Sequence, residues 1–369
     1  IVIGFVLNYD LQKWLGGVYV IKNLIQVINF YYKNIYLFKI IVNSKNKNIA
    51  KLIFNESDVI VSDIFDKKKF SFYYNIINII FFGKSNTYDY FFIKNKINLV
   101  SHSIYLGRKS LIPSFYWIPD FQHIEIKAMF SFIGRLLTHL NILCGIKNCT
   151  KIILSSHHNK KLLKKYFDVD NKKILISRFR FFLNYKKFKS NLRKKYNLPK
   201  KYFIITNQFW NHKNHNVLID AINHLNEHKF SNNKIHLVMT GKNFDHRSKK
   251  NYFRDIMNKI EKLKLKDNIR YLGVIKSDDL FFLIKNSIAL INPSLYEGWN
   301  SGVEQAMALN KKTILSSIAT HKEQADENTY FFSTNDYKKL SKHLVNLFRF
   351  SNIKPQKRLY INDIKKYAI

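Results

Sequence analysis

The sequence predicts an α/β protein made of two successive halves, each with a parallel sheet covered by helices. Short apolar runs rich in β-branched and aromatic residues recur along the chain, and longer segments with apolar residues at three-to-four spacing lie between them. This alternation is typical of a parallel sheet with helices on both faces. A polar and strongly basic segment at residues 184–201 interrupts the pattern, which then resumes. We therefore expect that segment to link two domains.

The first half supplies the strands and helices of one sheet. Helices are predicted at residues 16–31 and 158–167, where the apolar residues fall on one face. The predicted strands are the apolar runs at residues 1–6, 36–42, 58–64, 97–103, 114–118 and 151–156.

The second half repeats this arrangement after the basic segment. Its predicted helices cover residues 216–225, 251–263, 278–287 and 302–310. Its predicted strands cover residues 202–208, 234–242, 268–275, 288–294 and 312–318.

The charge of the chain is strongly positive. Lys and Arg number 62 against 25 Asp and Glu, for a formal net charge of +37. Such a field favours nucleic acid, anionic lipid headgroups or phosphorylated substrates. A coding bias toward Lys, Asn, Ile, Phe and Tyr would produce the same composition, and the aromatic residues mostly fall in strand-like runs. We therefore expect no nucleic-acid partner.

Cysteine usage and hydropathy narrow the expected location. Cys144 and Cys149 are the two cysteines, too few for a disulfide framework or for a zinc site with four cysteine ligands. A reducing, cytosolic location fits this usage. The apolar stretches are shorter than the roughly 20 residues of a membrane span, so no transmembrane anchor is expected. The first residues do not resemble a signal peptide.

The loop after the predicted strand at residues 288–294 is a candidate ligand site. In open α/β sheets, ligands bind in the crevice beyond the carboxyl ends of the strands. Here Asn300, Ser301 and Gly302 stand at the start of a helix, where unpaired N–H groups attract an anion. The alternative is an ordinary helix in which Ser301 is the N-cap and Glu304 completes a capping box.

A second candidate lies at residues 206–215, after the strand that opens the second half. Lys213 stands at the entrance to a predicted helix, where its ammonium group could bind phosphate oxygens. Asn207 and Gln208 can form hydrogen bonds with hydroxyl groups. A metal site at His212 and His215 lacks a carboxylate or cysteine partner at ligand spacing, so no metal is expected.

Two further groups lie in the first half. Asp120, Gln122 and His123 follow an aromatic strand, at the edge of the sheet where ligands bind. Gly16 and Gly17 open the first helix and permit close approach of a ligand to the backbone, although they lack the spacing of a dinucleotide fingerprint.

Taken in order, these stretches resemble the bacterial GT-B glycosyltransferases of family 4. The resemblance covers nearly the whole chain through the motifs GGVYVIKNL, WIPDFQH, NQFWNHKNH, LVMTGK, YLGVI, NPSLYEGWNSGVEQA and SSIATHKEQ. It implies two Rossmann-like domains that face each other across a cleft. Residues 1–185 would bind the acceptor and residues 186–349 the nucleotide sugar, with a terminal helix at about 350–369 that packs back on the first domain.

The resemblance also implies an activity. It indicates a hexosyltransferase-type enzyme that retains the anomeric configuration and needs neither a metal nor a cofactor, with the nucleotide-diphosphate sugar as substrate. His123 and Glu297 would act at the sugar, supported by Asp120, Gln122 and Glu304. The expected donor-binding residues are Gly16, Gly17, Asn207, Gln208, Lys213, Gly241, Lys242, Gly298, Trp299, Asn300, Ser301, Gly302 and Gln305.

Two positions depart from the family pattern. The pattern places a second glutamate eight positions after Glu297, at the ribose hydroxyls, and this sequence has Gln305 there. An amide can still bind hydroxyls but loses the charge-assisted part of the bond. Glu304 cannot replace it, because adjacent helical residues point about 100° apart. The family arginine five residues before Lys213 is Gln208 here.

The expected acceptor is a saccharide or a lipid-linked saccharide of a surface polysaccharide, such as lipopolysaccharide or capsule. A cytoplasmic protein acting at the inner face of the plasma membrane would give the positive charge a use, because basic side chains attract anionic lipid. Two alternatives remain: a sugar-nucleotide epimerase of the same fold, and a non-catalytic protein that binds sugar nucleotides.

Overall fold

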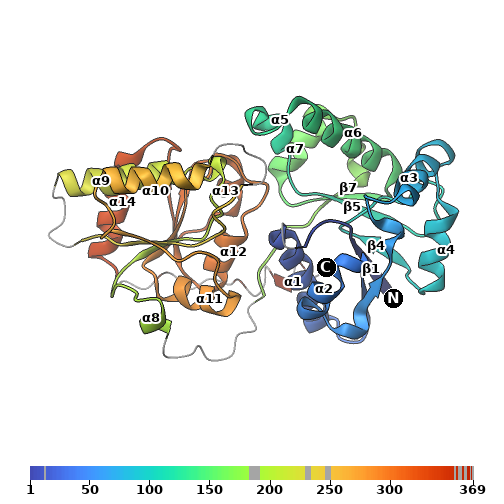
Figure 1. Cartoon of the computed structure of the whole chain (residues 1–369), viewed down its shortest axis with the longest axis horizontal. Helices are drawn as coiled ribbons and strands as arrows, with labels where there is room; N and C mark the ends of the chain where they lie inside the picture. The colour runs from blue at the N-terminus through green and yellow to red at the C-terminus, as the bar shows by residue number, and fades with distance from the viewer. Residues whose placement is uncertain are drawn as a thin grey trace. The chain divides into compact units, whose positions relative to one another are not determined.

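The computed structural model describes residues 1–11, 14–182, 192–228, 234–245, 251–352, 355, 360, 364–365 and 367. The chain divides into two compact units, Ile1–Phe182 with Asn362–Ile369, and Leu183–Ile361 (Figure 1). Each unit is a parallel sheet with helices on both faces, as the sequence predicts. The predicted domain boundary between residues 185 and 186 lies outside the described residues.

The first unit contains a parallel sheet of seven strands within its described residues, in the order β3-β2-β1-β4-β5-β6-β7. The strands are β1 (Val2–Leu7), β2 (Leu37–Val42), β3 (Val59–Val61), β4 (Leu99–Ser101), β5 (Ser114–Ile118), β6 (Lys151–Leu154) and β7 (Ile174–Ile176). The predicted strand regions contain β1 to β6, whereas β7 was not predicted. Its three residues are too short a run to distinguish from a loop.

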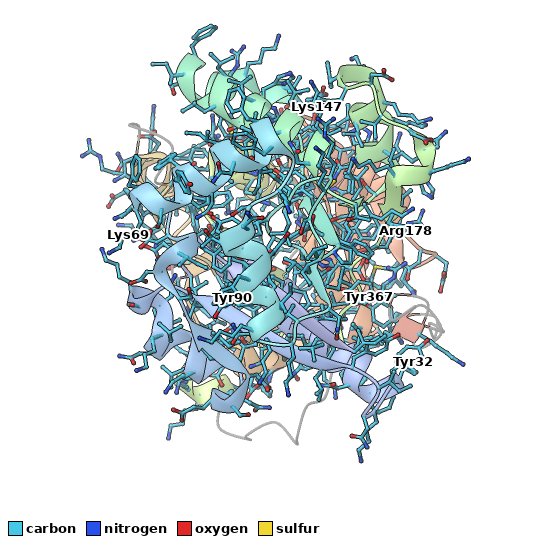
Figure 2. The ribbon with its side chains drawn as sticks, turned by 90° about the vertical axis from the view of Figure 1, so that its right-hand side faces the viewer. Tyr32, Lys69, Tyr90, Lys147, Arg178 and Tyr367 are labelled. Atoms are coloured by element: carbon cyan, nitrogen blue, oxygen red, sulfur yellow. The ribbon has the colours of Figure 1, made fainter. Side chains whose placement is uncertain are left out.

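Helices cover both faces of this sheet (Figure 1). They are α1 (Leu15–Tyr31), α2 (Lys47–Ile53), α3 (Phe70–Phe82), α4 (Asn86–Lys94), α5 (Gln122–Glu125), α6 (Phe132–Asn148) and α7 (His157–Tyr166). The predicted helices coincide with α1 and α7. Figure 2 looks onto the first unit from the side of α3 and α4 and labels Lys69 and Tyr90 there.

The second unit contains a parallel sheet of six strands within its described residues, in the order β10-β9-β8-β11-β12-β13. The strands are β8 (Phe203–Ile205), β9 (Leu237–Met239), β10 (Ile269–Tyr271), β11 (Ala289–Asn292), β12 (Lys312–Ser316) and β13 (Thr329–Phe332). The helices are α8 (Leu192–Lys195), α9 (His215–Glu227), α10 (Tyr252–Lys262), α11 (Ser277–Asn286), α12 (Ser301–Ala308), α13 (Ala319–Gln324) and α14 (Tyr337–Arg349).

The predicted linker at residues 184–201 contains a short helix, α8. Residues 184–191 lie outside the described residues, but α8 occupies part of the remainder. Leu192 is buried, and the phenol of Tyr196 and the ammonium of Lys195 both donate to Asp279 at 2.6 Å. Tertiary contacts therefore fold a basic segment that has little apolar periodicity of its own.

The strand orders place one switch point in each sheet. In the second unit the chain builds outward from β8 to β10, then returns to pair β11 with β8 and builds outward on the other side. The loops that follow β8 and β11 are therefore neighbours, which is where open α/β sheets bind ligands. The first unit has the same reversal between β1 and β4. Within the described ranges, no helix is both long and apolar enough to cross a bilayer.

Candidate active site

The switch point of the second unit brings together several predicted donor-binding residues. Asn207 follows β8, and its side-chain amide donates to the Asn292 amide oxygen at the end of β11, at 3.3 Å. Gly241 follows β9 with a φ of +131°, and a Cβ atom there would overlap the carbonyl group of Asn207. The N–H of Phe209 donates to the Lys242 carbonyl at 3.0 Å. The loop after β8 thus packs on both neighbouring strand ends, and glycine is required at the crossing.

Lys213 and Glu297 form a buried ion pair beside this amide pair. Their Nζ and Oε1 atoms lie 2.6 Å apart, and their side chains are 12% and 7% exposed. Asn214, in the left-handed region at a φ of +53°, donates to the carbonyls of Pro293 at 3.3 Å and Thr334 at 2.8 Å. These bonds dock the loop that carries Lys213 onto the start of the loop that carries Glu297 and onto the loop after β13.

The Glu297 carboxylate is held through one oxygen. Asn300 Nδ2 donates to Oε1 at 2.8 Å, beside the bond from Lys213. Among the described residues no hydrogen bond reaches Oε2. Burial by itself raises the pKa of Glu297, but Lys213, with His212 and His321, outweighs burial and lowers the pKa to about 2. Glu297 is therefore ionised and keeps one oxygen for a further donor.

The start of α12 differs from the predicted capping box. Asn300, and not Ser301, is the N-cap, because its side chain accepts from the Val303 N–H at 3.0 Å. Ser301 is the first helical residue and is exposed. Among the described residues no acceptor binds the N–H groups of Ser301 and Gly302. A Cβ at Gly302 would lie 2.6 Å from Thr206 Oγ1, so glycine lets the helix start close to β8.

Glu304 is an internal acceptor and not a capping residue. Its Oε1 accepts from Gln324 Nε2 at 3.0 Å, and its Oε2 accepts from the Tyr360 hydroxyl at 2.7 Å. Gln324 also donates to the Asn300 carbonyl at 2.9 Å. Gln305, the next residue, is half-buried. Glu304 thus positions the start of α12, and its carboxylate is enclosed by these partners.

Helix α13 supplies supporting residues that the sequence analysis quoted only as part of a motif. Thr320 Oγ1 donates to the Glu297 carbonyl at 2.7 Å. His321 is fully buried, and its Nδ1 lies 3.0 Å from the Ser316 carbonyl oxygen. The motif SSIATHKEQ was the available signal. Through their contacts, Thr320 and Gln324 of this motif hold the loop between β11 and α12 in place.

The remaining predicted residues of the second unit lie at or near the same strand ends. Gly298 is buried and Trp299 half-buried in the loop between β11 and α12, and Gln208 is half-buried after β8. His215 is a core residue, since its ring stacks on Phe209 at 4.3 Å between centroids. In the part of the chain that the structure describes, no three His, Cys, Asp or Glu residues form a group that could hold a metal.

His123 belongs to the first unit, in the short helix α5. The Asp120 carboxylate accepts from the backbone N–H and the side chain of Gln122, both at 3.0 Å, and so shapes the turn that leads to His123. His123 is 4% exposed. Its Nε2 has no hydrogen-bond partner among the described residues. Burial, with the nearby His139 and Arg135, lowers the pKa of His123 to about 4, so the imidazole is neutral at neutral pH.

An aromatic group at the carboxyl ends of β1, β4 and β5 was not predicted. Trp14 stacks on Trp117 with 5.6 Å between ring centroids and an interplanar angle of 20°. His102 lies 5.7 Å from Trp117. Gly17 is buried under Trp14, and a Cβ atom there would lie 2.8 Å from the indole. Gly16 is exposed with open space beside it, so Gly16 is the glycine that a ligand can approach.

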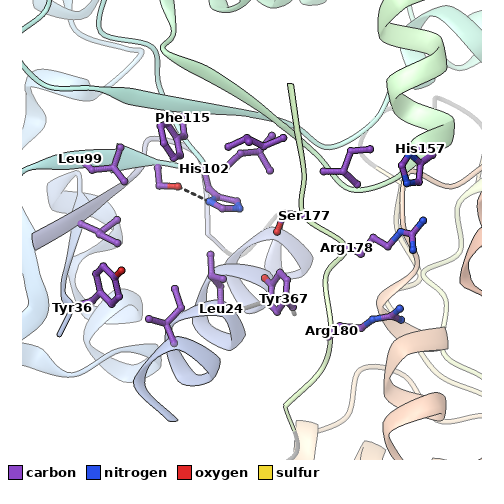
Figure 3. Close-up of a pocket in the computed structure, with 16 residues that line it drawn as sticks. Leu24, Tyr36, Leu99, His102, Phe115, His157, Ser177, Arg178, Arg180 and Tyr367 are labelled. Atoms are coloured by element: carbon purple, nitrogen blue, oxygen red, sulfur yellow. Dashed lines mark hydrogen bonds between the residues drawn. The ribbon is translucent and has the colours of Figure 1, made fainter. Parts of the chain in front are cut away.

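The first unit also contains a cavity of about 670 Å³ on one face of its sheet. Figure 3 shows Leu24 and Tyr36 on one side of it, Arg178 and Arg180 on the other, and Tyr367 between them. None of the predicted site residues lines it. This cavity is therefore separate from the predicted site.

Comparison with known proteins supports the predicted class. Residues 188–365 match the family model described as glycosyl transferases group 1. The O-antigen chain mannosyltransferase RfbU of Salmonella typhimurium is 23% identical over 221 residues, which is 59% of this chain and 56% of that protein. The match therefore spans little more than half of this relative.

Solved structures match the whole chain. A glycosyltransferase from Rickettsia africae matches with a TM-score of 0.66 and 16% identity over 100% of this chain and 91% of that one. Anabaena HepE, in complex with UDP and glucose, matches with a TM-score of 0.69 and 13% identity over 100% and 94%. At such identities the likeness shows the fold alone, and it confirms the predicted GT-B class. The family-model match at residues 188–365 falls almost entirely in the second unit, so this part of the chain resembles the glycosyl transferases of group 1.

Proposed function

We propose that the protein transfers a sugar from a nucleotide-diphosphate sugar to a saccharide acceptor, with retention of the anomeric configuration and without a bound metal. The observation that carries this proposal is the ion pair between Lys213 and Glu297, buried at the switch point of the second sheet. It provides a cation for phosphate and a carboxylate for sugar hydroxyls at one place.

The donor would bind between these groups. Glu297 Oε2 accepts a sugar hydroxyl, since Oε1 is already occupied by Lys213 and Asn300. The diphosphate lies against the N–H groups of Ser301 and Gly302, and the Lys213 ammonium turns toward it. As the bond from the anomeric carbon to the diphosphate breaks, its electron pair moves to the diphosphate. The acceptor hydroxyl oxygen forms the new bond to that carbon, and its proton passes to an oxygen of the departing diphosphate. Lys213 and the helix N-terminus stabilise that charge in place of a divalent cation.

His123 would act at the sugar from the first unit. Its imidazole is neutral at neutral pH, so each ring nitrogen is either a donor or an acceptor, depending on the tautomer. The buried Nε2, which has no hydrogen-bond partner among the described residues, is the atom that a sugar hydroxyl would contact. The role proposed for His123 is to orient the sugar, supported by Asp120 and Gln122.

The acceptor is proposed from a relative. RfbU is an O-antigen chain mannosyltransferase, and we propose that this chain also extends a surface polysaccharide of the O-antigen or lipopolysaccharide type. Its acceptor would be a saccharide or lipid-linked saccharide at the cytoplasmic face of an anionic membrane. The net charge of +37 supports such an association.

A panel of UDP- and GDP-sugars tests the proposal. Purified full-length protein should release nucleoside diphosphate from one donor when a crude lipid-linked acceptor is added. The Lys213→Gln variant should lower that rate at least about tenfold, because it loses an electrostatic contact to the leaving group. The control is Lys259→Gln, which breaks a half-exposed ion pair with Asp220. This variant should release nucleoside diphosphate at the unchanged rate.

Three outcomes would contradict transfer. Failure to bind any donor would exclude the proposed site. Conversion of a donor to its isomer without acceptor would identify an epimerase. Donor binding without turnover, in the presence of crude acceptor lipid, would identify a non-catalytic binding protein.

A further inference from the structure

The outward face of α3 is more apolar than its inward face. Phe70, Tyr73, Tyr74, Ile77 and Phe81 follow one another at helical spacing, and between 51% and 84% of each is exposed. The same helix buries a polar residue, Asn75, whose Oδ1 accepts from Ser85 Oγ at 2.5 Å. A helix stabilised only by its own domain would place its apolar stripe inward. This stripe therefore lacks a partner within the described residues.

Helix α6, which lies beside α3, also has an exposed stripe of apolar side chains. The two helices are in contact. Along α6, between 46% and 73% of each outward apolar side chain is exposed, at Phe132, Ile133, Leu136, Leu137 and Leu140. With about 200 Å² per large side chain and about half or more of each exposed, the two stripes present on the order of 1,000 Å². The largest apolar patch of a typical monomer is about 300–600 Å². We call the two stripes the apolar surface.

Basic residues border the apolar surface. Lys67, Lys68 and Lys69 directly precede α3 and are exposed. The side chains of Arg108 and Lys109 pack against Gly83, where α3 ends. Residues 67–119 contain eight Lys and Arg residues but a single acidic residue.

The one acidic residue in that stretch does not offset this charge. Asp89 is 4% exposed, and its carboxylate accepts from Ser110 Oγ at 2.5 Å. No exposed carboxylate therefore interrupts the basic border between residues 67 and 119. Such a border is complementary to an anionic partner.

We propose that the apolar surface of α3 and α6 docks on an anionic lipid bilayer. Aromatic and aliphatic side chains would enter the headgroup region, and the bordering lysines would contact anionic headgroups. Helices of 13 and 17 residues are shorter than the roughly 20 needed for a span, so they would lie in the plane of the interface. Figure 2 looks onto the first unit and labels Lys69 and Lys147, which precedes the end of α6.

The charge border decides between a bilayer and a second copy of this chain. Two copies joined through this surface would bring two positively charged borders together, because a symmetric dimer uses the same surface of both copies, and like charges repel. A bilayer with anionic lipids attracts all of them, at about 1 kcal/mol for each basic residue near the surface. The inference rests on the proposed function only in that a lipid-linked acceptor would give the docking a purpose.

Vesicle flotation tests the proposal with the full chain alone. The protein should float with phosphatidylcholine vesicles that contain phosphatidylglycerol, and much less with pure phosphatidylcholine. Raised salt should weaken the binding, because it screens the lysines. Equal flotation with both vesicle types, or with neither, would overturn the proposal.

Matched variants locate the surface. Replacement of Phe70, Phe81 and Phe132 by Ser should reduce the partition coefficient by more than about tenfold, because each loses apolar area. The control replaces Leu52, Phe244 and Val274, which are 86%, 60% and 67% exposed elsewhere, and should stay within about twofold. Unchanged binding by the first variant, with a native circular dichroism spectrum, would contradict the proposed surface.

Charge variants distinguish the effect of the basic border on vesicle binding from the effect of the overall net charge. The triple change of Lys67, Lys68 and Lys69 to Glu should lower binding to anionic vesicles by more than about tenfold. The same change at Lys338, Lys339 and Lys342 of α14 alters the net charge equally and should have little effect. Equal losses in both would mean that net charge alone drives binding.

Two further readouts keep the alternatives apart. Light scattering without vesicles shows the oligomeric state, and a dimer dissociated by the Phe→Ser variant, without vesicle binding, would assign the surface to a second copy. Donor turnover without flotation would refute the membrane surface and leave the proposed function intact. Flotation without any donor binding or turnover would support the membrane surface and refute the proposed function.

Discussion

At the scale of single residues, the site depends on one buried ion pair. Lys213 and Glu297 are 84 positions apart in the chain, and each has little exposed surface. A buried charge is costly unless it is paired and hydrogen-bonded, and the pairing with Lys213 lowers the pKa of Glu297 and keeps it ionised. The same pairing leaves Glu297 Oε2 without a partner among the described residues, which suits a carboxylate that binds a substrate hydroxyl.

The ion pair predicts a pH dependence of stability. The pKa of Glu297 falls from 4.5 to about 2 on folding, so its stabilisation is complete above about pH 4.5 and is lost as the pH falls toward 2. This contribution of Glu297 to the free energy of unfolding is on the order of 3 kcal/mol. In urea unfolding, Glu297→Gln should reduce the free energy of unfolding at pH 7 and much less at pH 3. The exposed Glu261→Gln change is the control, and an equal effect of both changes would contradict the assignment.

Gln305 predicts a gain of donor affinity on substitution. If it occupies the ribose position, Gln305→Glu restores a charge-assisted bond, and the dissociation constant for the nucleotide sugar should fall severalfold, by about 1 kcal/mol. Titration calorimetry would measure this. Gln208→Glu is the contrasting variant, since a carboxylate near the diphosphate should weaken binding. Unchanged or weaker binding by Gln305→Glu would show that the assumed register of α12 is wrong.

At the scale of elements, the start of α12 is held by partners distant in the sequence. Asn300 caps the helix, while Glu304 receives hydrogen bonds from Gln324 of α13 and from Tyr360, 56 positions away. These bonds place the N–H groups of Ser301 and Gly302 beside β8. The helix is thus oriented by its buried side, and its exposed first residue, Ser301, is left for a ligand.

Removal of the Tyr360 hydroxyl tests this arrangement. Tyr360→Phe leaves Glu304 Oε2 without that donor in a buried position, which should cost about 1–3 kcal/mol of stability. It should also raise the KM for the donor more than it lowers kcat, because the start of α12 shifts. Tyr90→Phe, at a 67% exposed position of α4, should change neither stability nor KM. A stability loss without any change in KM would limit Tyr360 to a structural role.

The apolar patterns of the individual elements explain which of them were predictable. Strands β1 to β6 were found because continuous apolar runs mark buried parallel strands. Helix α3 was not predicted, since it is apolar on both faces and lacks the one-sided periodicity of a soluble helix. Strand β13 was missed because its four residues, TYFF, do not stand out among the other aromatic runs.

At the scale of the whole molecule, the sequence alone predicted the two-unit architecture and the loops that carry the candidate site. The alternation of apolar runs predicts two α/β units, and the position of polar residues beyond strand ends predicts that the loops at residues 206–215 and after residue 294 are candidate ligand sites. Both follow from local sequence, because period and turn chemistry are local properties. The motifs of those loops, taken together, indicated the family.

Only the tertiary structure decided how the side chains pair. It paired Lys213 with Glu297, enclosed Glu304 between Gln324 and Tyr360, and moved the helix cap from Ser301 to Asn300. It also showed that the stripes of α3 and α6 face outward. These facts depend on which groups the fold brings within hydrogen-bond distance and which it leaves at the surface. Spacing along the chain does not encode distances between residues that meet only after folding.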